Sequence, residues 1–207
     1  MAPLPLLSAF YFGSVEHYRL LAAHPRVIID TGEHYLRQSY RVRTSIVGPN
    51  GVQHLAVPIE RRSGEKMPMH SVGLSYAETW PQQQLHALRS AYGNAPWTEH
   101  YLPDIEAVLR QGHSRLVDLD LATLRLGLRW LGLPTEVEIR ESYVEDPAGL
   151  LDLRLALHPK RALPVGVEPV PPYPQVFADR HGFVPRMSII DLVCNTGPEA
   201  LGRLLAS

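Results

Sequence analysis

The sequence predicts an α/β fold, and two observations carry this prediction. Apolar runs at residues 6–12 and 26–30 flank a helical segment, so strand, helix and strand follow one another within thirty residues. This order is typical of a βαβ unit with parallel strands. Asn50-Gly51 then separates two strand-like stretches, and this pair favours the positive φ of a hairpin turn. We therefore expect a Rossmann-like parallel core, an antiparallel hairpin and a helical C-terminal half.

Composition and charge fit a soluble protein with a sizeable core. The 207 residues are 45% hydrophobic, and 20 Lys and Arg against 21 Asp and Glu give a formal net charge of -1. This balance argues against general nucleic-acid binding, which usually shows as a basic surplus. No apolar stretch approaches the roughly 20 residues of a membrane span. The single cysteine, Cys194, excludes an internal disulfide and a multi-cysteine zinc site. We expect a cytoplasmic protein.

The N-terminal elements follow from apolar runs and their stop signals. MAPLPLLSAFYF lacks a basic n-region, so we interpret it as the start of the core and not as a signal peptide. Ser14 is a suitable N-cap for a helix, which ends at Pro25 because the residue before proline avoids the helical region. In the first hairpin strand, SYRVRTSIV, the period of two would place Arg41 and Arg43 on one face, about 7 Å apart.

The second half is predicted to be mainly helical. Helices are expected over residues 82–93, 95–112 and 118–133, and a strand over 136–144. Gly93 would end the first helix as a C′ glycine, and Pro103 would bend or break the second. Residues 146–155 are expected to form a turn and a short helix. A proline-rich connection, about 159–174, leads to two short helices that are too apolar to remain undocked, so we expect one domain over residues 1–207.

The turn after the first strand is the first candidate site. At Gly13 and Ser14 a strand runs into a helix N-terminus, so backbone N–H groups would face the carboxyl end of the parallel sheet. Ligands of open α/β sheets bind there, and anions gain from the helix dipole. His17, in the first helical turn, would then reach a phosphate or a leaving group. The alternative is that His17 only covers the end of the helix.

The second candidate is the polar segment EHYLRQSYRVR, residues 33–43. The arginine fork donates two parallel hydrogen bonds to a carboxylate or a phosphate, so Arg41 and Arg43 would form a binding wall. The upstream polar residues of this wall are Glu33, His34, Tyr35 and Gln38. The alternative is an exposed edge strand whose charges prevent edge pairing. A local basic patch surrounds the segment, and it comprises Arg37, Arg41, Arg43, Arg61, Arg62 and Lys66.

Two later segments carry further candidate groups. LRSAYGNAPWTEHY places Ser90 and Tyr92 at the end of a helix, and YPQVFADRHGFVPRMSIIDL contains His181 and Asp191 among apolar residues. Because a buried charge needs a partner, we expect Asp191 to contact a basic group. GxxxxGK[ST], HExxH, CxxC and GxSxG are all absent from the sequence, so no metal site is predicted.

Taken in order, these segments resemble the WbqC-like family, which is found in bacteria and partly associated with surface-polysaccharide gene clusters. The resemblance lies in FYFGSVEHYRLL, VIIDTGEHYLRQSYRVRTSIVGPNGVQHLAVPI, LRSAYGNAPWTEHY and YPQVFADRHGFVPRMSIIDLVCNTGPEAL. It is a resemblance to the compact branch of the family. It implies that the polar segment forms a binding site and not an edge strand.

The resemblance also implies a set of site residues. These are Tyr11, Phe12, Gly13, His34, Tyr35, Gln38, Tyr40, Arg41, Arg43, Ser90, Ala91, Tyr92, His181, Gly182, Phe183, Ser188, Asp191 and Asn195. Relatives carry asparagine at the position of Val42 and a His-Trp pair where this chain has Gln84-Leu85. If that histidine serves catalysis in relatives, this chain either lacks it or uses His86, at the next position after the pair, in its place.

The function implied is a cytosolic group-transfer enzyme, a transferase, acting on a nucleotide-activated sugar or an activated amino or acyl donor. It would serve bacterial surface-polysaccharide (O-antigen) biosynthesis, and its ligand would be a small molecule bearing phosphate or carboxylate. His17, His34 and His181 are the candidate catalytic residues, since an imidazole titrates near neutral pH. No cofactor is specified, although Mg²⁺ is expected if the ligand is a nucleotide. The alternative is a non-catalytic binding or scaffold protein of the same pathway.

Overall fold

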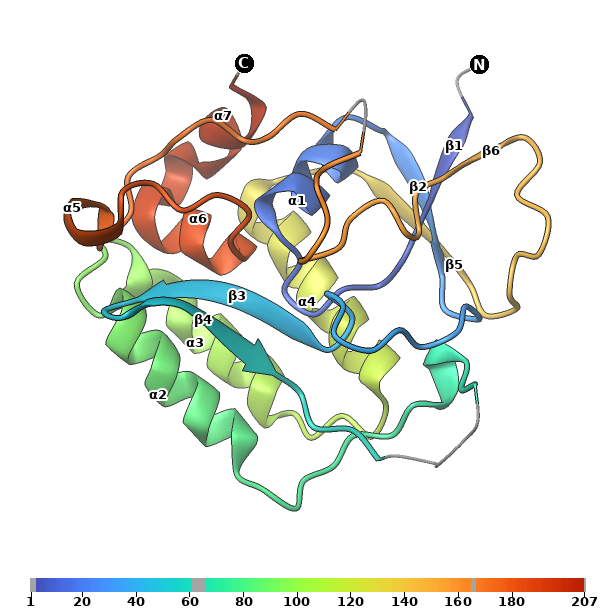
Figure 1. The fold of residues 1–207 in the computed structure, drawn as a ribbon, viewed down its shortest axis with the longest axis horizontal. Helices are drawn as coiled ribbons and strands as arrows, with labels where there is room; N and C mark the ends of the chain where they lie inside the picture. The colour runs from blue at the N-terminus through green and yellow to red at the C-terminus, as the bar shows by residue number, and fades with distance from the viewer. Residues whose placement is uncertain (1–2, 61–65, 165–166, 207) are drawn as a thin grey trace.

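The fold is built on a parallel sheet of four short strands in the order β5-β2-β1-β6. The strands are β1 (Leu4–Leu7), β2 (Arg26–Asp30), β5 (Glu136–Arg140) and β6 (Leu150–Asp152). The computed structural model describes residues 3–60, 66–164 and 167–206. Within that part of the chain, the sheet and a separate two-stranded hairpin confirm the α/β class (Figure 1).

The βαβ unit is confirmed, with β1 and β2 parallel and joined by α1 (Val15–Ala22). Leu6 pairs with Ile28, and both are fully buried, because helices and loops cover both faces of the sheet. The first strand is shorter than the apolar run 6–12 suggests. After Leu7 the chain leaves the sheet, and the N–H of Tyr11 donates instead to the carbonyl of Tyr40.

The hairpin is also confirmed, formed by β3 (Arg43–Gly48) and β4 (Gly51–Ala56). Gly51 has φ 101°, the positive value that the Asn-Gly turn requires. One expectation at the hairpin is wrong, because β3 begins only at Arg43. Arg41 lies in the turn before the strand and is buried, so the two arginines do not share a strand face.

Three long helices follow the hairpin, as predicted: α2 (Trp80–Tyr92), α3 (Thr98–Arg110) and α4 (Leu116–Leu131). A short 3-10 turn, η1 (Met69–Ser71), precedes them. Helix α2 packs against β3 and α3, beneath the hairpin in Figure 1. Helix α3 continues through Pro103. Gly93 ends α2 with φ -55°, so it is not left-handed. Glycine fits there because an added Cβ would lie 2.7 Å from the carbonyl oxygen of Arg89.

Residues 146–155 form the expected turn, in which the N–H of Leu150 donates to the carbonyl of Pro147 at 2.8 Å, but not the expected short helix. Leu150–Asp152 form β6, which pairs in parallel with the outer edge of β1, Leu4 opposite Leu150. The partner of this strand lies nearly 150 residues earlier in the chain, and local periodicity carries no sign of it.

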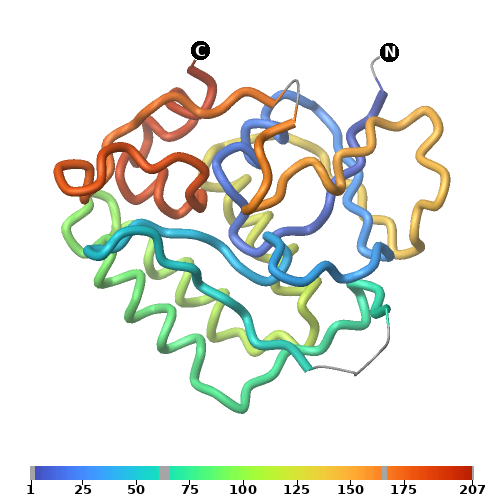
Figure 2. The backbone as a smooth tube through the Cα atoms, in the orientation of Figure 1, coloured from blue at the N-terminus to red at the C-terminus, as the bar shows by residue number. Residues whose placement is uncertain are grey.

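The C-terminal tail consists of α5 (Ala178–His181), α6 (Ile189–Thr196), η2 (Gly197–Glu199) and α7 (Ala200–Leu205). The two short helices expected after the proline-rich connection are thus confirmed as α6 and α7, which meet at η2. Both pack on α1, so the last two α-helices of the chain lie beside its first helix (Figure 2). Cys194 is buried in the main hydrophobic cluster together with Val15 and Leu21.

Candidate ligand-binding cleft

The side chain of Arg41 occupies the position where open α/β sheets commonly bind ligands. The strand order reverses between β1 and β6, and ligands favour the carboxyl ends of the strands at such a point. Nη2 of Arg41 donates there to Ser8 Oγ at 2.6 Å and to the carbonyl of Arg154 at 3.2 Å. Its Nε and Nη2 also donate to the two carboxylate oxygens of Glu33, at 2.9 and 2.6 Å. Arg41 is 1% exposed, so these contacts leave it no surface for a ligand.

Further charged groups complete this buried network. Arg154 Nη1 lies 2.6 Å from Asp30 Oδ2, and Asp30 Oδ1 accepts the N–H groups of Gly32 and Glu33. Asp30 therefore caps the turn that follows β2. Asp120 is buried nearby, and neither of its carboxylate oxygens has a hydrogen-bond partner in the described chain. Burial raises the pKa of Asp120 well above its usual range, while the Arg41 guanidinium opposes this shift.

The turn after β1 is closed by the segment that precedes α6. The N–H of Val15 donates to the carbonyl of Met187 at 2.9 Å, and the N–H of Ile189 donates to the carbonyl of Gly13 at 2.9 Å. Ser188 Oγ donates to the carbonyl of Phe12 at 3.1 Å. The open anion site expected at Gly13 and Ser14 is thus filled by the protein's own backbone.

His17 lies beneath this turn and is 1% exposed. Its ring centroid is 4.8 Å from that of Phe10, and a Cβ added at Gly13 would lie 2.3 Å from its Nδ1. Neither ring nitrogen has a hydrogen-bond partner among the described residues. Burial lowers the pKa of His17 to about 3, so the ring is neutral at physiological pH. This environment favours the interpretation of His17 as a buried cover of the helix end.

Substituting His17 by leucine is expected to reduce the acid sensitivity of the fold. The folded pKa of about 3 lies below the unfolded value near 6.5, so between these values the unfolded chain binds more protons. His17 therefore costs stability as pH falls through this window, by up to about 1.4 kcal/mol per pH unit. Urea unfolding of both proteins at pH 7, 6 and 5 measures this slope. Identical slopes would contradict the assignment.

Asp191 is the centre of a buried network of neutral donors. Its Oδ1 accepts the hydroxyl of Tyr92 at 2.9 Å, and its Oδ2 accepts the hydroxyl of Tyr173 at 2.7 Å and Nε2 of Gln175 at 2.8 Å. Nδ2 of Asn195 donates to the backbone carbonyl of Asp191 at 2.7 Å. The prediction that Asp191 contacts a basic group is therefore wrong. Burial raises the pKa of the Asp191 carboxyl, and these hydroxyl and amide donors partly offset the shift.

The remaining predicted site residues lie apart. His34 is exposed, with its ring 5.7 Å from that of Tyr143. His181 is exposed on α5, with Nε2 3.2 Å from the carbonyl oxygen of Pro49. The ring of His17 instead packs against the rings of Phe10 and Tyr18. Ser90 and His86 are exposed on α2, whereas Tyr11 and Tyr40 are buried. The hydroxyl of Tyr11 donates to Gln84 Oε1 at 2.6 Å.

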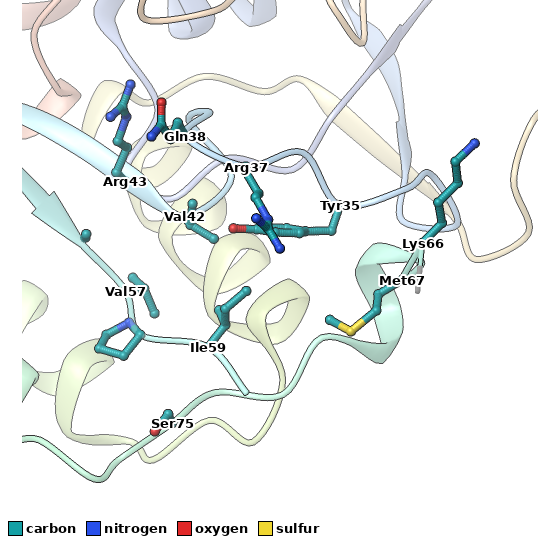
Figure 3. Close-up of a pocket in the computed structure, with 12 residues that line it drawn as sticks. Tyr35, Arg37, Gln38, Val42, Arg43, Val57, Ile59, Lys66, Met67 and Ser75 are labelled. Carbon is teal, nitrogen blue, oxygen red and sulfur yellow. The ribbon is translucent and has the colours of Figure 1, made fainter. Parts of the chain in front are cut away.

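A cleft of about 650 Å³ opens beside the polar segment. Its walls come from residues 35–43, from the end of β4 and the chain after it (residues 56–59), and from Lys66, Met67 and Ser75 (Figure 3). Of the predicted site residues, Tyr35, Gln38 and Arg43 line this cleft. Arg37 and Lys66 were absent from the predicted site, although both belong to the basic patch. Two further members of that patch, Arg61 and Arg62, lie outside the described residues.

The cleft is cationic on one side and apolar on the other. Arg37, Arg43 and Lys66 line it together with apolar side chains such as Val57 and Ile59, and none of the described lining residues is acidic. No ion pair of these three cations occurs within residues 3–60, 66–164 and 167–206. Arg37 extends into the cleft, whereas the charged ends of Arg43 and Lys66 point outward from its two ends (Figure 3).

A second groove, between α3 and α4, differs in charge. It is lined by Asp104 and Asp118 as well as by arginines, and Arg129 Nη2 is already 2.9 Å from Asp104 Oδ2. The cleft beside the polar segment is therefore the better candidate for an anionic ligand. Over the part of the chain that the structure describes, no group of three His, Cys, Asp or Glu side chains could hold a metal ion.

None of the described helices has both the length and the apolar character needed to cross a membrane. Comparisons with curated proteins and with solved structures gave no match. The model of the WbqC-like protein family matches residues 10–161, which is more than half of the chain. This range includes the turn after β1, the polar segment and all of the described cleft lining. The last of the four segments that carry the resemblance, residues 173–201, lies beyond it. The chain belongs to the WbqC-like protein family.

Proposed function

We propose that this protein binds a phosphate- or carboxylate-bearing small molecule in the cleft beside residues 35–43. The observation that carries the proposal is the combination of three cations in one concave site whose described lining residues include no acid. An uncompensated guanidinium at a pocket wall is suited to an oxyanion, because it donates charge-assisted hydrogen bonds in a planar fork. Arg43 supports this best, since its Nε is buried and has no hydrogen-bond partner among the described residues.

The ligand that fits the family context is a nucleotide-activated sugar, or an activated amino or acyl donor, of cytoplasmic surface-polysaccharide biosynthesis. In group transfer the cleft would hold the anionic part of the donor, and Tyr35 would contact its less polar part. The alternative is binding without catalysis in the same pathway. That alternative draws support from the histidines, because none of His17, His34 and His181 lines the cleft.

Arg37→Gln and Arg43→Gln are each expected to weaken binding of a nucleotide sugar by about tenfold or more. A hydrogen bond to a charged group contributes about 1.5–3 kcal/mol, and every 1.4 kcal/mol corresponds to a factor of ten. Titration calorimetry with UDP-glucose, and then with acyl-CoA, measures the dissociation constants. Arg125→Gln is the matched control, because it removes one positive charge from an exposed position on α4.

The results separate the candidate functions. If both cleft variants bind as tightly as the wild type, the cleft is not the binding site. If they lose binding, release of nucleoside diphosphate in the presence of cell-wall sugar acceptors distinguishes transfer from binding alone. Transfer that persists in His34→Ala and His181→Ala would remove these histidines as catalytic residues.

A further inference from the structure

Lys160 extends the cationic cleft beyond its own lining. Its Nζ donates to Oε1 of Gln38, which lines the cleft. Lys160 and Arg43 also act on the same two histidines: besides burial, both positive charges lower the pKa of His54, and both lower the pKa of His158. Two cations from distant parts of the chain therefore gather at the Gln38 end of the cleft.

The turn that carries Lys160 is held in one conformation by hydrogen bonds. The N–H of Lys160 donates to Nδ1 of His158 at 3.1 Å, and the N–H of Arg161 donates to the carbonyl of His158 at 3.2 Å. Arg186 donates from its guanidinium to the carbonyls of Arg161 and His158, at 2.6 and 2.7 Å. Because Nδ1 of His158 accepts a hydrogen bond, its ring is neutral and carries its proton on Nε2.

Backbone strain is concentrated at the residues that hold this turn. Among the described non-glycine residues, positive φ occurs at Phe12, Gln38 and Arg186, and two of these three contact the Lys160 turn. Gln38 has φ 55° and Arg186 has φ 65°. Strain of this kind persists only where the surrounding structure over-determines it, and it clusters at ligand clamps.

Charge near the Lys160 turn is predominantly positive. Arg161 adds to the positive charges that act on His158, besides Arg43 and Lys160, whereas the charge of Arg41 is compensated by Glu33. Glu16 is a buried acidic group whose pKa is raised mainly by burial and lowered in part by Arg186. The cations at this turn that have no ion-pair partner among the described residues leave positive charge available to an external anion.

We infer that the cleft binds a diphosphate, with one phosphate at Arg37 and the adjacent phosphate at Arg43 and Lys160. This inference rests on the proposed function and narrows its ligand class. A single carboxylate or monophosphate would engage only one of the two cationic groups. A diphosphate engages both at once, so the second contact adds affinity without a second association step.

The test is titration calorimetry of the full-length protein with inorganic orthophosphate and with pyrophosphate. In the wild type we expect pyrophosphate to bind at least about tenfold more tightly than orthophosphate. Lys160→Gln is expected to reduce this ratio about tenfold, and Arg125→Gln, the charge-matched control, is expected to leave it unchanged. Proton NMR of the imidazoles gives a second readout, since pyrophosphate bound beside Lys160 should raise the pKa of His54 and His158.

The outcomes distinguish the two proposals. If Arg37→Gln weakens anion binding but Lys160→Gln leaves the ratio and both histidines unaffected, the diphosphate inference is wrong and the binding cleft stands. If the wild type binds neither anion but binds UDP-glucose or acyl-CoA, the diphosphate inference fails alone; if it binds none of these, the proposed function fails with it. Where pyrophosphate binds as expected, UDP and geranyl diphosphate identify the source of the diphosphate. Tighter binding of UDP points to a nucleotide, and tighter binding of geranyl diphosphate points to a lipid carrier.

Discussion

Replacing Arg41 by methionine is expected to lower the free energy of unfolding by about 3–5 kcal/mol. The substitution leaves the Glu33 carboxylate buried without its partner, and Ser8 loses the donor that contacts it at 2.6 Å. Breaking a buried ion pair from one side is costly because the remaining charge is neither hydrated nor paired. For a chain of this length the melting temperature should fall by roughly 6–20 °C.

Arg37→Met provides the matched control for this prediction. Arg37 belongs to the same segment but is exposed, so its replacement should change the free energy of unfolding by no more than about 0.5 kcal/mol. Urea unfolding of the three proteins at pH 7 measures the difference. Ligand binding should show the reverse order. Arg37→Met should weaken binding more than Arg41→Met does, since Arg37 lines the cleft and Arg41 does not. Equal stability of Arg41→Met and Arg37→Met would show that Arg41 is not part of the structural network.

Asp191→Ala is expected to destabilise the fold by a similar amount, about 3–5 kcal/mol. It leaves the hydroxyls of Tyr92 and Tyr173 and the amide of Gln175 buried without an acceptor. Each unsatisfied buried group costs about 1–3 kcal/mol. The network joins α2, α6 and the proline-rich connection, so its loss should loosen the docking of the C-terminal tail.

Hydrogen exchange gives a site-specific measurement of that loosening. Amides of α6 and of the segment around Tyr173 should exchange faster in Asp191→Ala, whereas those of β2 should keep their protection until global unfolding. Asp179→Ala is the control, because Asp179 is an exposed acid on α5 and its removal should be nearly neutral. Unchanged exchange in α6 would contradict a structural role for Asp191.

These two predictions distinguish polar residues that stabilise the fold from polar residues that line the cleft. Several polar residues marked by the family resemblance, including Arg41, Tyr92 and Asp191, are buried and saturated by contacts within the protein. Arg37, Lys66 and Lys160, the cations that accompany Arg43, were not marked. The resemblance was confirmed at the level of the family. Of the site residues that it implied, some stabilise the fold and others line the cleft for which we propose a ligand.

Local signals in the sequence were sufficient for the elements that depend on near neighbours. The βαβ unit followed from two apolar runs around a helix that begins after Ser14, and the hairpin followed from Asn50-Gly51. The three long helices were predicted from their own stretches of sequence. In each case the residues that specify the structure lie within a turn or two of the backbone they specify.

Only the tertiary structure decided which polar residues are buried and which face a ligand. Arg41 and Arg37 are four positions apart and chemically identical, yet one fills the end of the sheet and the other lines the cleft. The difference depends on Ser8 and Arg154, which the parallel pairing of β1 with β6 brings together. A short strand finds its partner through long-range burial and backbone hydrogen bonding, and a buried charge is placed by the groups that compensate it. Neither the strand pairing nor the charge compensation can be predicted from a local stretch of sequence, because both form only when distant segments meet.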